Sequence, residues 1–443
     1  MLTKKYYRWV AIAAAVAVLV IALRTCGASS DLTNQPPDEE IDAELTLRTV
    51  TLEQPDENGN LLWRIKAKAV NYSPDSQKAE LTELEGEFFQ AGKTIYTVKA
   101  DKGEVQQNGE TLYLRGNLVA TSTEGELTLQ GERLKWQPKQ DLLVMGNFQD
   151  DALVDSVEDA TDKLKGDAAG ENLDENLGRS QKGNAPPVKA LTTQDLLDKT
   201  AAKNAPVFGF NPQMEMIAQV VSVSNQDNRV ELTGGVAAKS KASPWLTFAS
   251  EQLTWLTEQE LIQTAKPLTV EKYQAEGYET VTDRVIGAKG NVQLAKNIVT
   301  LDESVQLESL TQPLKVNSEV AVWDVNAQTV EMNSPVNIEQ PERKVTASAN
   351  QASLDLAQQV VYLTGNVRAN GEKNNSRLQA DRVVWKTQSQ DIEAEGNVQY
   401  EQAASPEASI SGEKAIGNIE QGTVVILGGE SGDVVTEIVP KDF

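Results

Sequence analysis

The chain carries an internal repeat of about 31 residues, and no other feature restricts its fold as strongly. Each copy starts with a small residue, and the residue after it is usually polar. A bulky apolar residue lies five positions further on, where four of the seven tryptophans stand. Repeats of this length are typical of stacked units that share one core. The small residues are Ala67, Ala100, Gly131, Ala218, Ser250, Gly287, Ser318, Ala349, Ala380 and Gly412.

Each copy is expected to contain two antiparallel strands joined by a polar turn. Apolar and charged residues alternate in the way of a half-buried strand, as in Trp63 and Ile65 against Arg64 and Lys66. A Gly-Asn pair then interrupts the second strand. A hairpin turn would favour Asn-Gly, so a bend or bulge within a long strand is the better interpretation. The pairs are Gly116-Asn117, Gly146-Asn147, Gly365-Asn366 and Gly396-Asn397. Recurring bends predict a sheet wrapped into a V-shaped roll with an apolar inner face.

Composition excludes several classes of function. Lys and Arg number 41 against 65 Asp and Glu, so the net charge is −24, which argues against nucleic-acid binding. Without histidine and with Cys26 alone, the chain cannot hold a His- or Cys-based nucleophile or zinc site, or an internal disulfide. Carboxylate pairs could still act as acid and base, but no spacing singles one out. We therefore expect no enzyme activity, metal or cofactor.

The N-terminus has the pattern of a signal anchor. Lys4, Lys5 and Arg8 precede an apolar run over Trp9–Leu23, so the first residues are expected to stay cytoplasmic while the rest is exported. Cys26 stands where a lipoprotein cysteine would, but Arg and Thr before it fit that motif poorly. An uncleaved anchor is favoured, with lipidation of Cys26 as the alternative. The anchor residues are Trp9, Val10, Ile12, Val16, Val18, Leu19, Val20, Ile21 and Leu23.

The chain divides into five segments by composition. Residues 1–26 form the signal anchor or lipoprotein signal, and residues 27–40 a polar, Pro-containing spacer. Strand patterning covers residues 41–149. Residues 150–207 lack aromatic residues and are rich in acids, which predicts a disordered linker. Strand patterning returns over residues 208–440, so the predicted fold is all-β with two repeat modules behind an N-terminal transmembrane helix.

One set of residues in the first module follows the pattern of a known family. The set contains residues 58–67 (NGNLLWRIKA), Tyr72, Phe88, Gly92-Lys93, Tyr96, Ala100, residues 112–118 (LYLRGNL), residues 134–138 (LKWQP) and Gly146-Asn147. With these residues the first module resembles the LptC family, the bitopic periplasmic component of the lipopolysaccharide export machine. The second module resembles the related OstA/LptA-type β-jellyroll that bridges the periplasm in the same machine. The chain departs from the usual family pattern in its length, its acidic linker and its second array.

The resemblance implies a function in lipid transport. Lipopolysaccharide or a similar glycolipid would be pushed by an inner-membrane ABC transporter, and its acyl chains would slide through apolar β-jellyrolls toward the outer membrane. An LptA-like bridge protein would pair with an open strand edge. The chain would be a single-pass inner-membrane protein with its bulk in the periplasm, held to the membrane by its N-terminal helix.

Alternation along the strands selects the candidate groove residues. In the first module they are Leu61, Trp63, Ile65, Leu112, Leu114, Leu118, Leu127, Leu129, Leu134 and Trp136; in the second they are Val383, Trp385, Ile392 and Val398. Taken singly, each is better explained as an ordinary core residue, because apolar alternation mostly builds cores. The groove hypothesis therefore rests on the set as a whole. Two other functions stay open. One is an exported parallel β-helix that binds or cleaves polysaccharide, and the other is a purely structural spacer in the envelope.

Overall fold

The computed structural model describes residues 45–73, 78–106, 111–123, 127–148, 206–311, 313–372, 375–403, 407–428 and 435–439. They belong to one compact unit, Leu45–Phe443. The predicted anchor with Cys26, the spacer and residues 150–205 of the predicted linker lie outside the described residues. Among the helices of the described part, none has the length and apolar character that crossing a membrane requires.

The unit is all-β, as predicted. Its strands are β1 (Leu45–Pro55), β2 (Leu61–Ser73), β3 (Lys78–Gln90), β4 (Lys93–Gln106), β5 (Leu112–Ser122), β6 (Thr128–Gln137), β7 (Leu142–Gly146), β8 (Val207–Phe210), β9 (Met214–Ala218), β10 (Val220–Ser224), β11 (Arg229–Ser240), β12 (Leu246–Leu256), β13 (Leu261–Thr264), β14 (Leu268–Tyr273), β15 (Val281–Gly287), β16 (Lys289–Gln293), β17 (Ile298–Ser309), β18 (Leu314–Asp324), β19 (Thr329–Met332), β20 (Val336–Gln340), β21 (Val345–Ala349), β22 (Gln351–Asp355), β23 (Val360–Gly371), β24 (Ser376–Lys386), β25 (Asp391–Gln402), β26 (Glu407–Asn418), β27 (Thr423–Leu427) and β28 (Val435–Val439). Two 3-10 turns, η1 (Pro138–Gln140) and η2 (Pro341–Arg343), follow β6 and β20.

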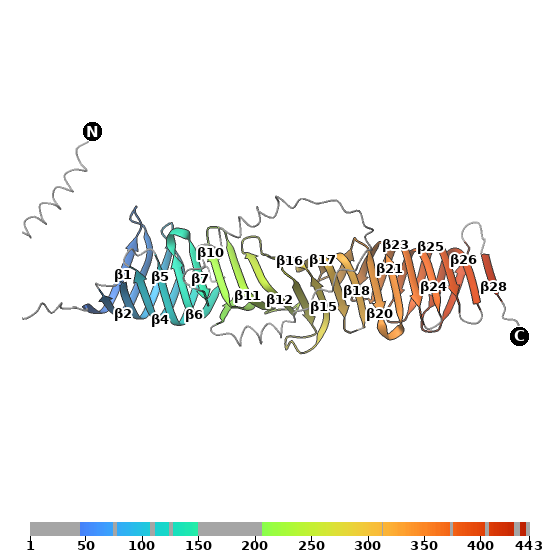
Figure 1. Cartoon of the computed structure of the whole chain (residues 1–443), viewed down its shortest axis with the longest axis horizontal. Helices are drawn as coiled ribbons and strands as arrows, with labels where there is room; N and C mark the ends of the chain where they lie inside the picture. The colour runs from blue at the N-terminus through green and yellow to red at the C-terminus, as the bar shows by residue number, and fades with distance from the viewer. Residues whose placement is uncertain are drawn as a thin grey trace, which may run out of the picture. The chain divides into compact units, whose positions relative to one another are not determined.

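The described strands form one antiparallel sheet that runs from β1 at one end to β27 and β28 at the other (Figure 1). Where a strand is broken, as in β7 and β8, both pieces pair with the strand before them. This pairing does not fit the parallel β-helix alternative, whose strands would run side by side in one direction. The two predicted modules also share this sheet. β6 pairs with β8, and β7 pairs with β10, so hydrogen bonding passes from one array to the other. Sequence alone had suggested two separate modules, because residues 150–207 look like an interdomain linker.

The sheet is folded along a line of bends, which we call the crease. One wall, wall A, contains β8, β9, β14, β15, β20, β21 and β28; wall B contains β7, β10, β13, β16, β19, β22 and β27. The longer strands cross the crease from one wall to the other. Side chains of the two walls meet inside: the ring of Phe88 in wall A stacks on Trp136 in wall B, with centroids 5.0 Å apart.

The predicted Gly-Asn bends are confirmed at three of the four sites. Gly116-Asn117, Gly365-Asn366 and Gly396-Asn397 lie within continuous strands, where the pairing register shifts by a bulge. Both residues of each pair have positive φ, a conformation that glycine and asparagine tolerate best. The fourth pair differs: Gly146 is the last residue of β7, and the chain leaves the sheet there.

The small residue of each repeat lies at the crease, opposite an apolar residue of the preceding strand. Gly131 faces Leu118, Ser250 faces Val236, and Ala380 faces Val367. A small side chain is needed because the fold leaves little space between the walls here. At Gly287 a Cβ atom would lie 2.9 Å from the Cβ atom of Leu301. This crowding explains why Ala, Gly or Ser recurs at the start of the repeat.

The structural repeat is a four-strand unit, twice the sequence repeat. Its first strand is broken (β9/β10, β15/β16, β21/β22), and its second carries a bulge of two positive-φ residues (β11, β17, β23). Its third is continuous and carries a tryptophan (β12, β18, β24). Its fourth is bent or broken again (β13/β14, β19/β20, β25). Trp255, Trp323 and Trp385 thus occupy every second sequence repeat, with smaller apolar residues in between.

The predicted linker is inserted into the fourth strand of the first unit. β7 and β8 pair with the two ends of β6 in the way that β13 and β14 pair with β12. Val207 opens β8 opposite Ala218, as Leu268 opens β14 opposite Gly287. A proline precedes the apolar residue in each broken fourth strand: Pro206, Pro267 and Pro335. The insertion therefore begins and ends at the crease, and the strand on either side keeps its partners.

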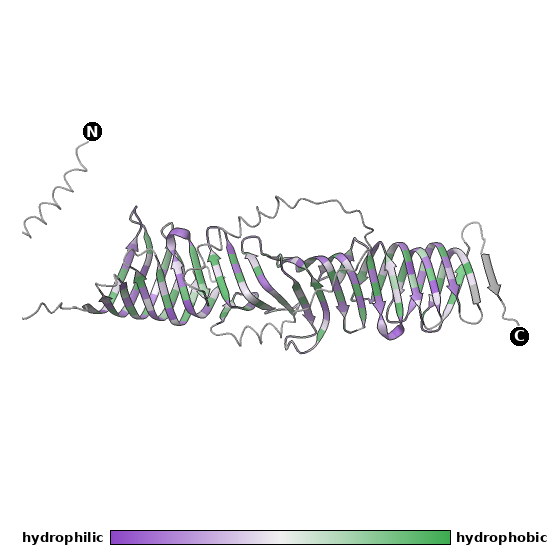
Figure 2. Cartoon of the chain, viewed as in Figure 1, coloured by the Kyte–Doolittle hydropathy of each residue, from purple (hydrophilic) through white to green (hydrophobic). Residues whose placement is uncertain are grey.

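One hydrophobic core runs between the walls, from Trp63 to Ala415. Hydrophobic and hydrophilic residues alternate along the strands, as Figure 2 shows in green and purple. Each strand therefore buries one face and exposes the other, which is the pattern of an antiparallel sheet with one covered side.

Candidate functional site

The interior of the first array is filled with side chains. The predicted groove residues Trp63, Ile65, Leu112, Leu114, Leu118, Leu127, Leu129, Leu134 and Trp136 all lie in the core. Leu61 is the exception: it is half-buried, and its neighbour Leu62 packs against the core instead. Near the same end of the core, burial and the charge of Asp141 raise the pKa of the Tyr96 hydroxyl above its ordinary value.

The interior opens in the second array, where a cavity of about 710 Å³ lies between the walls. Its apolar lining comes from wall A through Ala347, Leu378 and Tyr400. Wall B contributes most of the predicted groove residues of this array, Val383, Trp385 and Ile392, and also Leu363 and Val424. The fourth, Val398, is a core residue that does not line the cavity. The size falls within the range of about 300–1,000 Å³ that small-molecule sites occupy.

The four tryptophans of the repeat share an unusual feature. The indole N–H groups of Trp136, Trp255, Trp323 and Trp385 are buried and have no hydrogen-bond acceptor among the described residues. Only Trp385 lines the large cavity. Because the feature recurs at the other three, it belongs to the position in the repeat and does not mark a ligand contact at Trp385.

The mouth of the roll is the side opposite the crease, where the turns of the two walls approach each other. In the middle of the second array it is bridged, because Lys272 Nζ of wall A donates to Gln328 Oε1 in a wall B turn at 3.0 Å. At the large cavity the mouth carries charges: Arg343, Lys344 and Arg377, with Glu342, Glu372 and Glu420. The site is therefore apolar inside and charged at its mouth.

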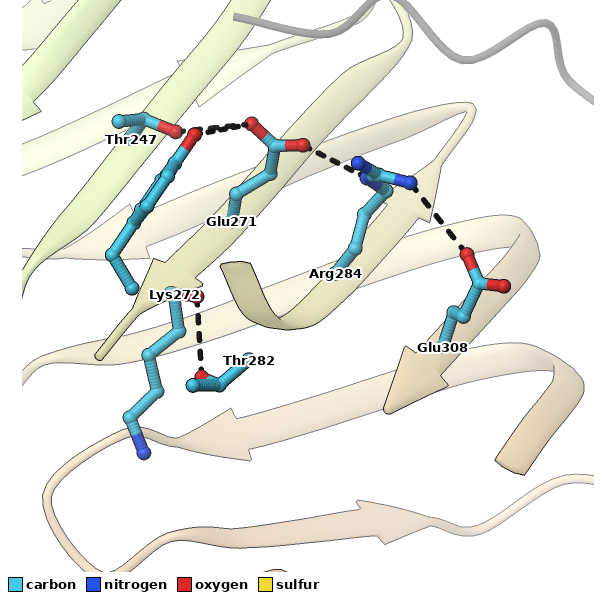
Figure 3. Close-up of polar contacts among 7 residues, drawn as sticks. Thr247, Glu271, Lys272, Thr282, Arg284 and Glu308 are labelled. Carbon is cyan, nitrogen blue, oxygen red and sulfur yellow. Dashed lines mark hydrogen bonds and ion pairs between the residues drawn. The ribbon is translucent and has the colours of Figure 1, made fainter. Parts of the chain in front are cut away.

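A polar network lies on the outer face of wall A, and sequence reasoning missed it (Figure 3). Glu271 is 2% exposed; its carboxylate accepts bonds from Arg284 Nε at 2.8 Å and Tyr273 Oη at 3.0 Å. Arg284 also contacts Glu308 at 3.6 Å, so the network ties β14, β15 and β17 together. Burial, with a contribution from the charge of Glu271, raises the pKa of Tyr273 to about 12.

A second hollow of about 590 Å³ lies beside this network, lined by Phe208, Trp245, Tyr273, Tyr278 and Lys239 among others. The ring centroids of Trp245 and Tyr278 lie 6.1 Å apart, and those of Tyr273 and Tyr278 lie 5.1 Å apart, both in edge-to-face arrangements. Each of these aromatics stands alone in the sequence pattern, so nothing in the sequence signalled that they would meet.

Within the described part of the chain, no group of three or more His, Cys, Asp or Glu residues could hold a metal ion. The arrangement that the structure does present is an apolar interior with a cavity, which is suited to binding an apolar chain.

Comparison with protein families matches the chain to the family described as lipopolysaccharide-assembly, LptC-related, over residues 10–144 and 338–432. The two matches together span more than half of the chain. The chain belongs to this LptC-related family. The first family match ends in β7, just before the insertion, and the second runs from β20 beyond β27. Every residue that lines the 710 Å³ cavity lies within the second match.

Among solved structures, the chain is similar to LptH from Pseudomonas aeruginosa, described as the LptA homologous periplasmic component of the lipopolysaccharide transport device. The identity is 14% and the TM-score 0.26, over 29% of this chain and 97% of LptH. A search of curated proteins gave no match.

Proposed function

We propose that the chain is a membrane-anchored periplasmic component of a lipopolysaccharide export bridge, which binds acyl chains between its walls and passes lipid toward the outer membrane. The observation that carries this proposal is the apolar cavity lined by Val383, Trp385 and Ile392 within a region that matches the LptC-related family. Binding, and not catalysis, is the role that such a lining suits.

Physical chemistry supports acyl chains as the ligand. Each methylene moved from water into an apolar site contributes about 0.8 kcal/mol, so a long chain gains affinity from a lining that offers few directional contacts. Contacts of this kind also let a chain slide, because no single one fixes its position. The packed core beside Leu114 and Trp136 would have to separate before a chain could enter there.

The proposed partners follow from the ends of the chain. An inner-membrane ABC transporter would deliver the lipid near the anchor at Trp9–Leu23. An LptA-like protein would extend the sheet by pairing with a strand at one of its ends. Among the described strands, β1 pairs with β2 alone, and β27 and β28 each pair with β26 alone.

Photo-crosslinking in cells tests the proposal. A photoreactive residue at Ile392, which lines the cavity, is expected to form adducts with lipopolysaccharide. The matched control is the next residue, Glu393, which pairs with Lys414 on the outer face and should give no adduct. Absence of adducts at Ile392, Trp385 and Leu114 alike would overturn lipid transport and favour the structural spacer.

A further inference from the structure

One ion pair joins the two walls across the mouth of the large cavity. Arg343 Nη1 lies 3.0 Å from Glu420 Oε2. Arg343 ends the turn η2 between β20 and β21 of wall A, and Glu420 lies in the turn between β26 and β27 on the wall B side. By contrast, pairs such as Arg64–Glu53 and Arg284–Glu271 join neighbouring strands. The pair therefore spans the opening and does not hold adjacent strands together.

Arg343 can exchange Glu420 for another anion at a small cost in free energy. The side chains of Arg343 and Glu420 are 36% and 58% exposed, and a pair that is so open to water contributes little to stability. A guanidinium binds carboxylates and phosphates alike through two parallel hydrogen bonds. An anion brought to the mouth could therefore replace Glu420 on Arg343 at small cost.

The cavity suits an amphiphilic ligand. Leu363, Trp385 and Tyr400 line its interior, while Arg343, Lys344 and Arg377 stand at its mouth. Among the described residues, Lys344 and Arg377 form no ion pair. The carboxylates of Glu342 and Glu372 also line the cavity, so the mouth has no strong positive field of its own. An anionic head group is therefore recognised only by direct contact with one of the cationic side chains at the mouth.

We propose that this cavity takes an amphiphile with an anionic head group, which displaces Glu420 and pairs with Arg343 while its chain lies against Trp385. The inference rests on the proposed function, because it assumes that an acyl chain occupies the cavity. It adds the residue that recognises the head group, Arg343, and the ion pair that the head group displaces.

The test uses the full chain and two fluorescent probes of equal length, a long-chain fatty acid and its methyl ester. The wild type should bind the fatty acid more tightly than the ester. Glu420→Gln frees Arg343, so we expect fatty-acid affinity to rise by up to about five-fold, the scale of an exposed ion pair, with the ester unchanged. Arg343→Gln should remove the preference for the fatty acid.

Glu372→Gln is the matched control, since it makes the same charge change at the same cavity without touching Arg343. An equal effect of Glu420→Gln and Glu372→Gln would show a general field and overturn the inference. Equal binding of both probes to the wild type would also overturn it while leaving the proposed function intact. If neither probe binds, the proposed function itself fails.

Discussion

At the scale of single residues, the crease is held by a side-chain clasp. Asn397 Nδ2 donates to Asp381 Oδ2 at 2.7 Å, and Asn117 makes the same bond to Asp101 at 2.7 Å. In both cases the aspartate directly follows the small residue of the repeat. The polar residue seen at that position in the sequence therefore has a structural purpose in these copies, which is to hold the bulge of the neighbouring strand.

Gly396→Ala should weaken the roll locally. Gly396 has φ +78, and an added Cβ atom would lie 2.6 Å from Asp381 Oδ2. The control, Gly59→Ala, replaces a glycine with φ +85 and no neighbour within 4 Å, so it adds only the backbone cost of about 1–2 kcal/mol. We expect a larger loss at Gly396, measured as faster amide hydrogen exchange in β24 and β25.

Asp381→Ala in the Gly396→Ala background separates the two causes. It removes the atom that an added Cβ would meet, so it should restore part of the lost protection. If Gly396→Ala and Gly59→Ala cost the same, the clasp does not restrict the bulge.

At the scale of elements, the four-strand unit determines where residues can be inserted or removed without loss of strand pairing. The broken fourth strands are interrupted at Ala265–Pro267 and at Asn333–Pro335, whereas the first unit holds the whole of residues 147–206 at that place. Val207 Cγ2 lies only 3.0 Å from where a Cβ of Gly146 would be, so the chain returns close to the point where it left. A short connection can therefore span the gap.

Replacing residues 149–205 with three Gly or Ser residues should leave the sheet intact. A shorter loop loses less entropy on closing, and we expect a gain in stability of about 2 kcal/mol. Thermal unfolding followed by circular dichroism measures it. As a control, the same three residues are inserted in β12 after Phe248, which is buried in a continuous strand. This insertion should lower the midpoint temperature of unfolding. A lower midpoint for the linker replacement itself would show that residues 149–205 stabilise the fold.

Several elements could be predicted from the sequence, because their signals are local. The strands follow from alternation around Trp63 and Ile65, and the bends from Gly-Asn pairs such as Gly396-Asn397. The doubling of the repeat was missed, although the tryptophans alternate with Val or Leu. Ala265–Pro267 resembles an ordinary loop until its strand partners are known.

At the scale of the whole unit, the decisive contacts are the ones that sequence could not supply. The pairing of β6 with β8 joins residues on opposite sides of the insertion, and Arg343 meets Glu420 across six intervening strands. Such contacts depend on how the walls close, which no local pattern encodes. The apolar positions of the two arrays look alike in sequence, yet the large cavity lies near Trp385 and not near Trp136.

One continuous sheet predicts a gradient of local stability. In a stacked array each strand is supported by its neighbours, so an end strand with one neighbour opens more often than a central one. Hydrogen exchange should therefore be fastest in β1, β27 and β28, and slowest in β11 to β18. Equal protection throughout would indicate that the sheet unfolds as a single cooperative block.

Because the sheet is built from four-strand units, its length can change by whole units when the gene gains or loses a repeat. Strands in a sheet lie about 4.8 Å apart, so gaining or losing one unit would move the last strand by roughly 19 Å. The walls, the crease and both end strands would keep their chemistry. A duplication in frame with the unit would thus alter the reach of the protein without redesigning either end.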